Sequence, residues 1–170
     1  MSIMYICHKK TMKITILCVG KIKEDFYRKA VLEYAKRLGR YCKLEIIEVS
    51  DEKTPDFAGS ALEKQIKEKE GERLLRYVKE GMYVIALAID GISFDSIQMS
   101  KEIEKLGITG KSSLAFVIGG SLGLSEQVLK RADMKLSFSK MTFPHQLMRV
   151  ILLEQIYRSY RIINHEPYHK

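Results

Sequence analysis

The stretch Leu136–Arg149, LSFSKMTFPHQLMR, indicates the fold class of this chain more clearly than any other. A short apolar segment ending at Phe138 is typical of a strand, and residues 139–142 form a polar loop. Pro144 then opens a helical pattern that runs to about Asn164, since proline suits the first turn, where its missing N–H would be unpaired anyway. Ligands of open α/β folds bind where strands lead through loops into helices. The stretch therefore predicts one wall of a ligand site.

Outward from that stretch, strand patterns and helix patterns alternate along the chain. The predicted strands are Met12–Val19, Lys43–Val49, Met82–Ile89, Ser113–Ile118 and Met134–Phe138. The predicted helices are Lys23–Leu38, Ala61–Lys79 with an interruption at Gly71, Ser96–Leu106, Glu126–Arg131 and Pro144–Asn164, and Asp90-Gly91 is a predicted turn. Near-continuous apolar strands are typical of parallel sheets, because helices cover both faces. The alternation predicts an α/β fold with a parallel-type sheet of about five strands.

Composition limits the class of protein further. With 170 residues, 46% hydrophobic and 29% charged, the chain is expected to form one globular domain. No apolar run approaches the ~20 residues of a membrane span. Residues 1–11 lack the apolar core of a signal peptide, so we expect an N-terminal extension followed by a single domain over 12–170. The scattered Cys7, Cys18 and Cys42 do not suggest disulfides, which favours a reducing cytoplasm.

The net charge of +8 is unevenly distributed along the chain. Residues 1–50 carry 11 basic and 5 acidic side chains, residues 51–127 carry 10 and 13, and residues 128–170 carry 8 and 3. If the two basic ends meet in space, they form a positive surface suited to a polyanion. A solvated basic face without any partner is an equally good interpretation of charge alone.

The glycine loop Gly119-Gly120-Ser121-Leu122-Gly123 follows one predicted strand and precedes a helix. It matches the G-x-S-x-G nucleophile elbow of serine hydrolases, for which Asp133 and either His145 or His169 would complete a triad. The phosphate-binding pattern with Gly-Lys-Ser/Thr is absent. Glycines also allow a backbone to approach a flat cofactor closely.

Several motifs together resemble one known family. They are the opening MKITILCVGKIKEDFYRKAVLEYAKRL, the loop FVIGGSLGL, the segment LSFSKMTFPHQLMR, the helix LLEQIYRSYRI and the ending HEPYHK. In this order they resemble the ribosomal RNA large subunit methyltransferase H family over Met12 to Lys170. That family belongs to the SPOUT class, so the resemblance implies a C-terminal trefoil knot, which is rare among folds.

The resemblance also implies an S-adenosylmethionine pocket made by three loops. The corresponding residues here are Leu87, Gly119, Phe138, Ser139, Lys140, Met141, Thr142 and Phe143. The implied reaction methylates N3 of a pseudouridine in helix 69 of 23S rRNA within the assembled 70S ribosome. The family forms homodimers, and neither a metal nor a membrane is expected.

Three residues are candidates for contact with the rRNA substrate. His169 is a possible acceptor of the N3 proton, because imidazole titrates near pH ~6.5, although a water or phosphate relay is equally open. Tyr168 could stack on a base, and Arg149 could contact rRNA phosphates. Two other functions stay open: a serine hydrolase built on Ser121 and a non-catalytic basic protein that binds the ribosome.

Overall fold

The computed structural model describes residues 11–168, so the predicted extension at residues 1–11 lies, except for Thr11, outside the described residues. The strands are β1 (Lys13–Val19), β2 (Lys43–Val49), β3 (Tyr83–Ser93), β4 (Ser113–Ile118) and β5 (Met134–Ser137). The helices are α1 (Asp25–Leu38), α2 (Ser60–Leu75), α3 (Ser96–Ile108), α4 (Glu126–Arg131) and α5 (His145–Ile163). In this part of the chain the strands form one sheet in the order β2-β1-β4-β3-β5, with every neighbouring pair parallel. The predicted α/β architecture is confirmed.

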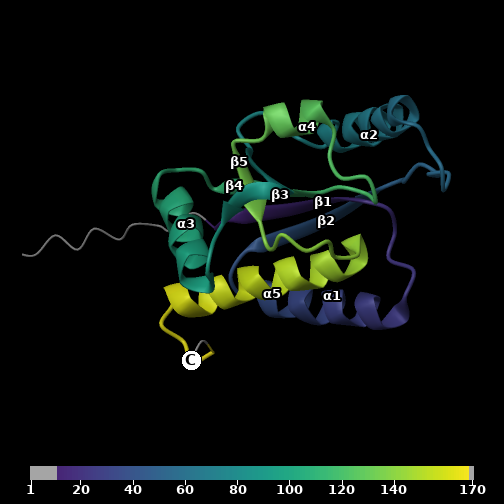
Figure 1. The fold of residues 1–170 in the computed structure, drawn as a ribbon. Coiled ribbons are helices and arrows are strands. Elements are labelled where there is room, and N and C mark those ends of the chain that lie inside the picture. The colour runs from purple at the N-terminus through teal and green to yellow at the C-terminus, as the bar shows by residue number, and fades with distance from the viewer. Residues whose placement is uncertain (1–10, 169–170) are drawn as a thin grey trace, which may run out of the picture.

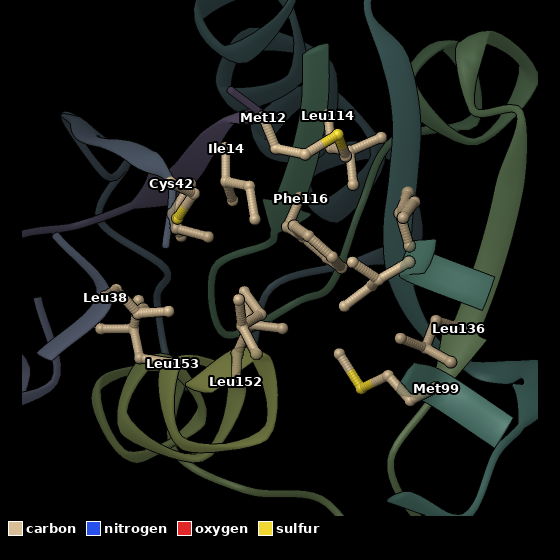
Figure 2. Packing of buried hydrophobic residues seen from close by; sticks show 14 of the residues in the cluster. Met12, Ile14, Leu38, Cys42, Met99, Leu114, Phe116, Leu136, Leu152 and Leu153 are labelled. Atoms are coloured by element: carbon tan, nitrogen blue, oxygen red, sulfur yellow. The ribbon is translucent and has the colours of Figure 1, made fainter. Parts of the chain in front are cut away.

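Helices cover both faces of the sheet, which is why its central strands are apolar on both sides (Figure 1). Helices α2 and α4 pack together on one face, and α5 packs between α1 and α3 on the other. The larger core lies on the α5 side and includes Phe116 of β4 together with Leu152 and Leu153 of α5 (Figure 2). The smaller core, around Leu17 and Val117, lies beneath α2 and α4.

Helix α2 runs unbroken through Gly71, so the predicted interruption is wrong, and the helix ends at Leu75 rather than at Lys79. The glycine serves packing instead of breaking the helix. A Cβ at this position would overlap the Ser125 hydroxyl and come 3.3 Å from a methyl group of Val128. Ser125 itself caps α4, since its Oγ accepts the Val128 N–H at 3.4 Å.

Strand β3 continues through Asp90-Gly91, where the sequence predicted a turn. Its pairing with β5 shifts register, so that both Leu87 and Ile92 face Leu136. A Cβ on Gly91 would lie 2.7 Å from the carbonyl of Lys135, and only glycine allows the two strands to approach so closely. The trefoil knot implied by the resemblance stays a prediction.

The parallel arrangement positions the site. Because all five strands point the same way, their carboxyl ends share one edge of the sheet. Gly20 follows β1, the glycine loop follows β4, and Phe138 follows β5 at this edge. The loops predicted to bind a ligand are therefore neighbours in space, although up to about 50 residues separate them in sequence.

Candidate functional site

A cavity of about 270 Å³ opens between the middle of β3 and the carboxyl ends of β4 and β5. Seven of the eight residues predicted to bind the cofactor line it: Leu87, Gly119, Phe138, Ser139, Met141, Thr142 and Phe143. The eighth, Lys140, is exposed to solvent and does not line the cavity. The structure therefore brings the three predicted loops together, and a cofactor contact by Lys140 stays a prediction.

The glycine loop forms a tight backbone turn at one wall of the cavity. The Gly123 N–H donates to the Gly120 carbonyl at 3.1 Å, and Gly123 has a left-handed φ of 84°. A Cβ on Gly119 would lie 2.6 Å from the carbonyl carbon of Gly123. The requirement for glycine at position 119 is therefore steric, whereas Gly123 needs the positive φ.

The opposite wall is the loop between β5 and α5, which is ordered by its own hydrogen bonds. Ser139 Oγ accepts the N–H of Met141 at 2.9 Å, and the Ser137 hydroxyl donates to the Ser139 carbonyl at 3.2 Å. This turn directs the Lys140 side chain outward and leaves Met141 at the mouth of the cavity, 73% exposed.

The lining suits a ligand that is partly aromatic and partly polar. Leu87, Ile118, Leu136 and Phe138 supply an apolar floor, and the glycine loop and Thr142 supply backbone and hydroxyl groups at the rim. The cavity volume of about 270 Å³ lies just below the roughly 300–1,000 Å³ that is typical of ligand sites. A nucleoside with a long substituent would fill the cavity and extend out of its mouth toward a second reactant.

Beneath the glycine loop lies a buried carboxyl group, Glu70 on α2, which is 4% exposed. One oxygen accepts the Glu52 N–H at 2.9 Å, and the other has no partner among the described residues. A Cβ on Gly120 would come 2.9 Å from that second oxygen. Burial raises the pKa of Glu70 above its usual range.

Arg149 has a structural role instead of the predicted contact with rRNA phosphates. Its side chain is 1% exposed and donates to Glu48 Oε1 at 2.6 Å, to the Val19 carbonyl at 2.9 Å and to the Gly20 carbonyl at 2.6 Å. These bonds hold the end of β1 against α5. Because the buried guanidinium donates to acceptors inside the protein, it is not available to rRNA phosphates. The prediction of a phosphate contact by Arg149 is therefore wrong.

Tyr168 folds back on the helix of its own chain. Its ring lies edge-on to Tyr157 with centroids 5.0 Å apart, under the guanidinium of Arg158 at 4.6 Å, and its hydroxyl bonds Glu154 at 3.2 Å. Burial, together with the nearby Glu154 carboxylate, raises the pKa of Tyr168 to about 12. The phenol is therefore a neutral donor at physiological pH, and it does not line the cavity of its own chain. His169 lies outside the described residues.

The predicted hydrolase triad is not assembled through Asp133. Ser121 is exposed at the carboxyl edge of the sheet. Asp133 lies at the amino end of β5, where its carboxylate accepts the Val84 N–H at 2.7 Å and pairs with Arg131 at 3.2 Å. Ser121 and Asp133 therefore lie at opposite edges of the parallel sheet and cannot belong to one triad. This geometry argues against nucleophilic catalysis by Ser121.

Two residues at the start of α5 connect the cavity to the end of β1, a link the sequence did not reveal. Gln146 Oε1 accepts the Lys23 N–H at 2.8 Å and the Glu24 N–H at 3.4 Å. His145, which we considered only as a triad member, lines the cavity beside Gly20 and Asp51. The only available signal was the position of His145 directly after Pro144.

Two further observations concern other kinds of site. Across residues 11–168, no three His, Cys, Asp or Glu side chains gather in a way that could hold a metal ion. Within the same range, no helix combines the length and the apolar character needed to cross a bilayer.

Comparison with known proteins identifies relatives over nearly the whole chain. The model of a family described as "Predicted SPOUT methyltransferase" matches residues 12–169. A protein of Clostridium kluyveri named ribosomal RNA large subunit methyltransferase H is 60% identical, covering 94% of this chain and all of that protein. The protein of the same name in Clostridium tetani is 64% identical with the same coverage. A Legionella pneumophila protein described as a methyltransferase, solved with S-adenosylmethionine bound, has a TM-score of 0.48 and 11% identity, covering 88% of this chain and 66% of its own.

Proposed function

The chain belongs to the SPOUT methyltransferase family, and from this premise we propose that it is an S-adenosylmethionine-dependent methyltransferase of large-subunit ribosomal RNA. The finer proposal is that it methylates N3 of a pseudouridine in helix 69 of 23S rRNA within the assembled 70S ribosome. Relatives about 60% identical over their full length carry the name of a large-subunit rRNA methyltransferase, which supports the coarser proposal. The finer proposal rests on the family resemblance of the sequence motifs.

The observation that carries the proposal is the convergence of three loops on one cavity. The middle of β3 and the loops after β4 and β5 each contribute a residue predicted for the cofactor, namely Leu87, Gly119 and Phe138. The apolar floor suits an adenine ring, and the glycine loop allows a ribose or carboxylate to approach the backbone without a Cβ in the way. The residues present therefore fit the cofactor.

Bound S-adenosylmethionine supplies an electrophilic methyl group on a sulfonium. The task of the chain is to hold that group in line with the N3 atom and to exclude water, since alignment of two reactants can provide up to roughly 7–11 kcal/mol. The loop from Phe138 to Phe143 would form one wall around the bound cofactor, and its internal hydrogen bonds hold that wall in shape. No metal is needed for this chemistry.

A homodimer would complete the site. Tyr168 packs against α5 and does not line the cavity of its own chain. A tail that works in catalysis would therefore have to act on the cavity of a second copy. We propose that the tail, including Tyr168 and His169, positions the target nucleotide in the site of the partner subunit, and that a single subunit is inactive.

The charge distribution supports an rRNA substrate. Helices α1 and α5, which come from the two basic ends of the chain, pack side by side (Figure 1). Lys21 and Lys23 are exposed where β1 ends, on the same edge as the cavity. If Z phosphates are neutralised, log K should fall with log salt at a slope of about −0.7Z to −0.9Z. Salt-independent affinity for ribosomes would contradict this electrostatic account.

Two experiments test the proposal and its alternatives. Calorimetry should detect stoichiometric S-adenosylmethionine binding, which neither a serine hydrolase nor a non-catalytic ribosome-binding protein requires. Transfer of a labelled methyl group should then be faster to 70S ribosomes than to free 50S subunits. Ser121→Ala should leave transfer largely intact, and its complete loss would revive the hydrolase. Ribosome binding without cofactor binding would favour the non-catalytic protein.

A further inference from the structure

His145 occupies the junction between the cofactor cavity and the end of β1. The residue opens α5 and lines the cavity. A Cβ on Gly20 would lie 3.4 Å from its Nε2 and 3.6 Å from its Cε1, so the ring lies directly over that glycine. Gly20 has a φ of 79°, a conformation that glycine adopts without strain. A Cβ there would make only ordinary van der Waals contact with the imidazole, so the positive φ and not the ring is what favours glycine.

We propose that His145 is the general base that accepts the N3 proton of the target nucleotide. The inference rests on the proposed function and deepens it, because methylation at N3 requires that a proton leave that nitrogen. His145 is the imidazole that the described residues place in the cavity wall. The rest of the wall is built of apolar, hydroxyl and glycine residues that cannot accept a proton near neutral pH.

The step balances in atoms and charge. The imidazole nitrogen of His145 takes the N3 proton while a bond forms between N3 and the methyl carbon. The bond between that carbon and the sulfonium sulfur breaks, and its electron pair stays on sulfur as a neutral thioether. The positive charge of the sulfonium is thereby transferred to the imidazolium, which later releases its proton to water.

The surroundings of His145 keep it available as a base. Burial, followed by the positive charge of Arg149, lowers the pKa of His145 below its ordinary value, so the ring is neutral at physiological pH. Asp51 acts in the opposite direction and favours the imidazolium once it forms, and Lys23 again disfavours it. These charged groups reach the ring from α5, from the end of β2 and from the end of β1.

The test compares two matched variants, His145→Asn and His165→Asn. His165 is exposed at the far end of α5 with a φ of 54°, a conformation that asparagine tolerates. In single-turnover transfer to unmodified 70S ribosomes, His145→Asn should slow the reaction by ~10²- to 10⁴-fold. Its affinity for S-adenosylmethionine should stay within about twofold of wild type, a small change on the scale of binding energies. His165→Asn should react like the wild type, and free imidazole should restore part of the rate of His145→Asn only.

The pH profile separates proton transfer from a structural role. The wild-type rate should rise to a plateau with a midpoint below pH ~6.5, the ordinary value for histidine. Asp51→Asn removes the charge that raises the pKa of His145 and should move the midpoint down, whereas Lys23→Met should move it up. Both variants keep His145, so they test whether His145 accepts the proton even if His145→Asn loses cofactor binding.

The proposal is overturned if His145→Asn transfers methyl at the wild-type rate. It is also overturned if neither the Asp51 nor the Lys23 variant moves the midpoint, or if His169→Asn abolishes the pH-dependent limb instead. No transfer by the wild-type protein would refute the proposed function itself, and this inference with it.

Discussion

The burial of Arg149 makes a quantitative prediction about stability. Its guanidinium makes three charged hydrogen bonds at 2.6–2.9 Å, to Glu48 and to two backbone carbonyls. Breaking a buried ion pair costs about 3–5 kcal/mol. Because the Glu48 side chain is 30% exposed and can be rehydrated, we take the lower end of this range. Arg149→Met, which keeps most of the volume, should lower the free energy of unfolding by about 3 kcal/mol.

Urea and thermal denaturation measure this change. A loss of 3 kcal/mol corresponds to a fall in Tm of roughly 6–12 °C for a chain of this size. Arg37→Met is the matched control, since Arg37 pairs with Glu33 on the exposed face of α1 and should contribute little. At a temperature where Arg149→Met is folded, its ribosome binding should keep the wild-type salt slope.

Two results would refute this account of Arg149. One is a loss of less than about 1 kcal/mol, which is what a single ordinary hydrogen bond contributes. The other is a salt slope that falls by about one unit, which is the signature of a lost phosphate contact.

Three further predictions concern the loops and the tail. Gly119→Val should abolish S-adenosylmethionine binding in a folded protein, because its side chain would collide with Gly123; undiminished binding in calorimetry would remove this loop from the site. Glu70→Gln should raise the urea midpoint at neutral pH. Because the pKa of Glu70 is raised in the folded state, the stability of the wild type falls as pH rises from about 4.3 through the folded-state pKa. The variant should lack this fall in stability. An identical pH dependence of stability in both proteins would contradict the prediction. Deleting Tyr168 to Lys170 should leave cofactor binding intact while methylation collapses, and mixing this deletion with Gly119→Val should restore one working site per heterodimer. If heterodimers form and stay inactive, the tail does not act on the partner subunit.

The elements of the fold could be predicted from local patterns because most of them have local causes. Apolar runs such as Ser113–Ile118 became strands with the predicted bounds. Ser125 and Asp95 begin α4 and α3 through side-chain caps, and Asp95 forms a capping box with Gln98. The predicted cofactor loops also reached the same cavity, because parallel strands align their carboxyl ends.

The features that could not be predicted from the sequence depend on contacts with residues far away along the chain. Arg149 looked like a surface cation because the residues it bonds, Glu48, Val19 and Gly20, are 101 to 130 residues distant. Gly71 looked like a helix break because its neighbour Ser125 lies on another element. Periodicity reports the apolar face of a segment, but it does not tell which side chain fills the space opposite.

The central claim is tested most directly by mapping the methyl group on rRNA. Unmodified 70S ribosomes would be incubated with the protein and labelled S-adenosylmethionine, and the 23S rRNA then digested and analysed by mass spectrometry. We predict one methyl group per ribosome, on N3 of a pseudouridine in helix 69. A methyl group on another nucleotide, or no incorporation by a folded protein that binds the cofactor, would contradict the account.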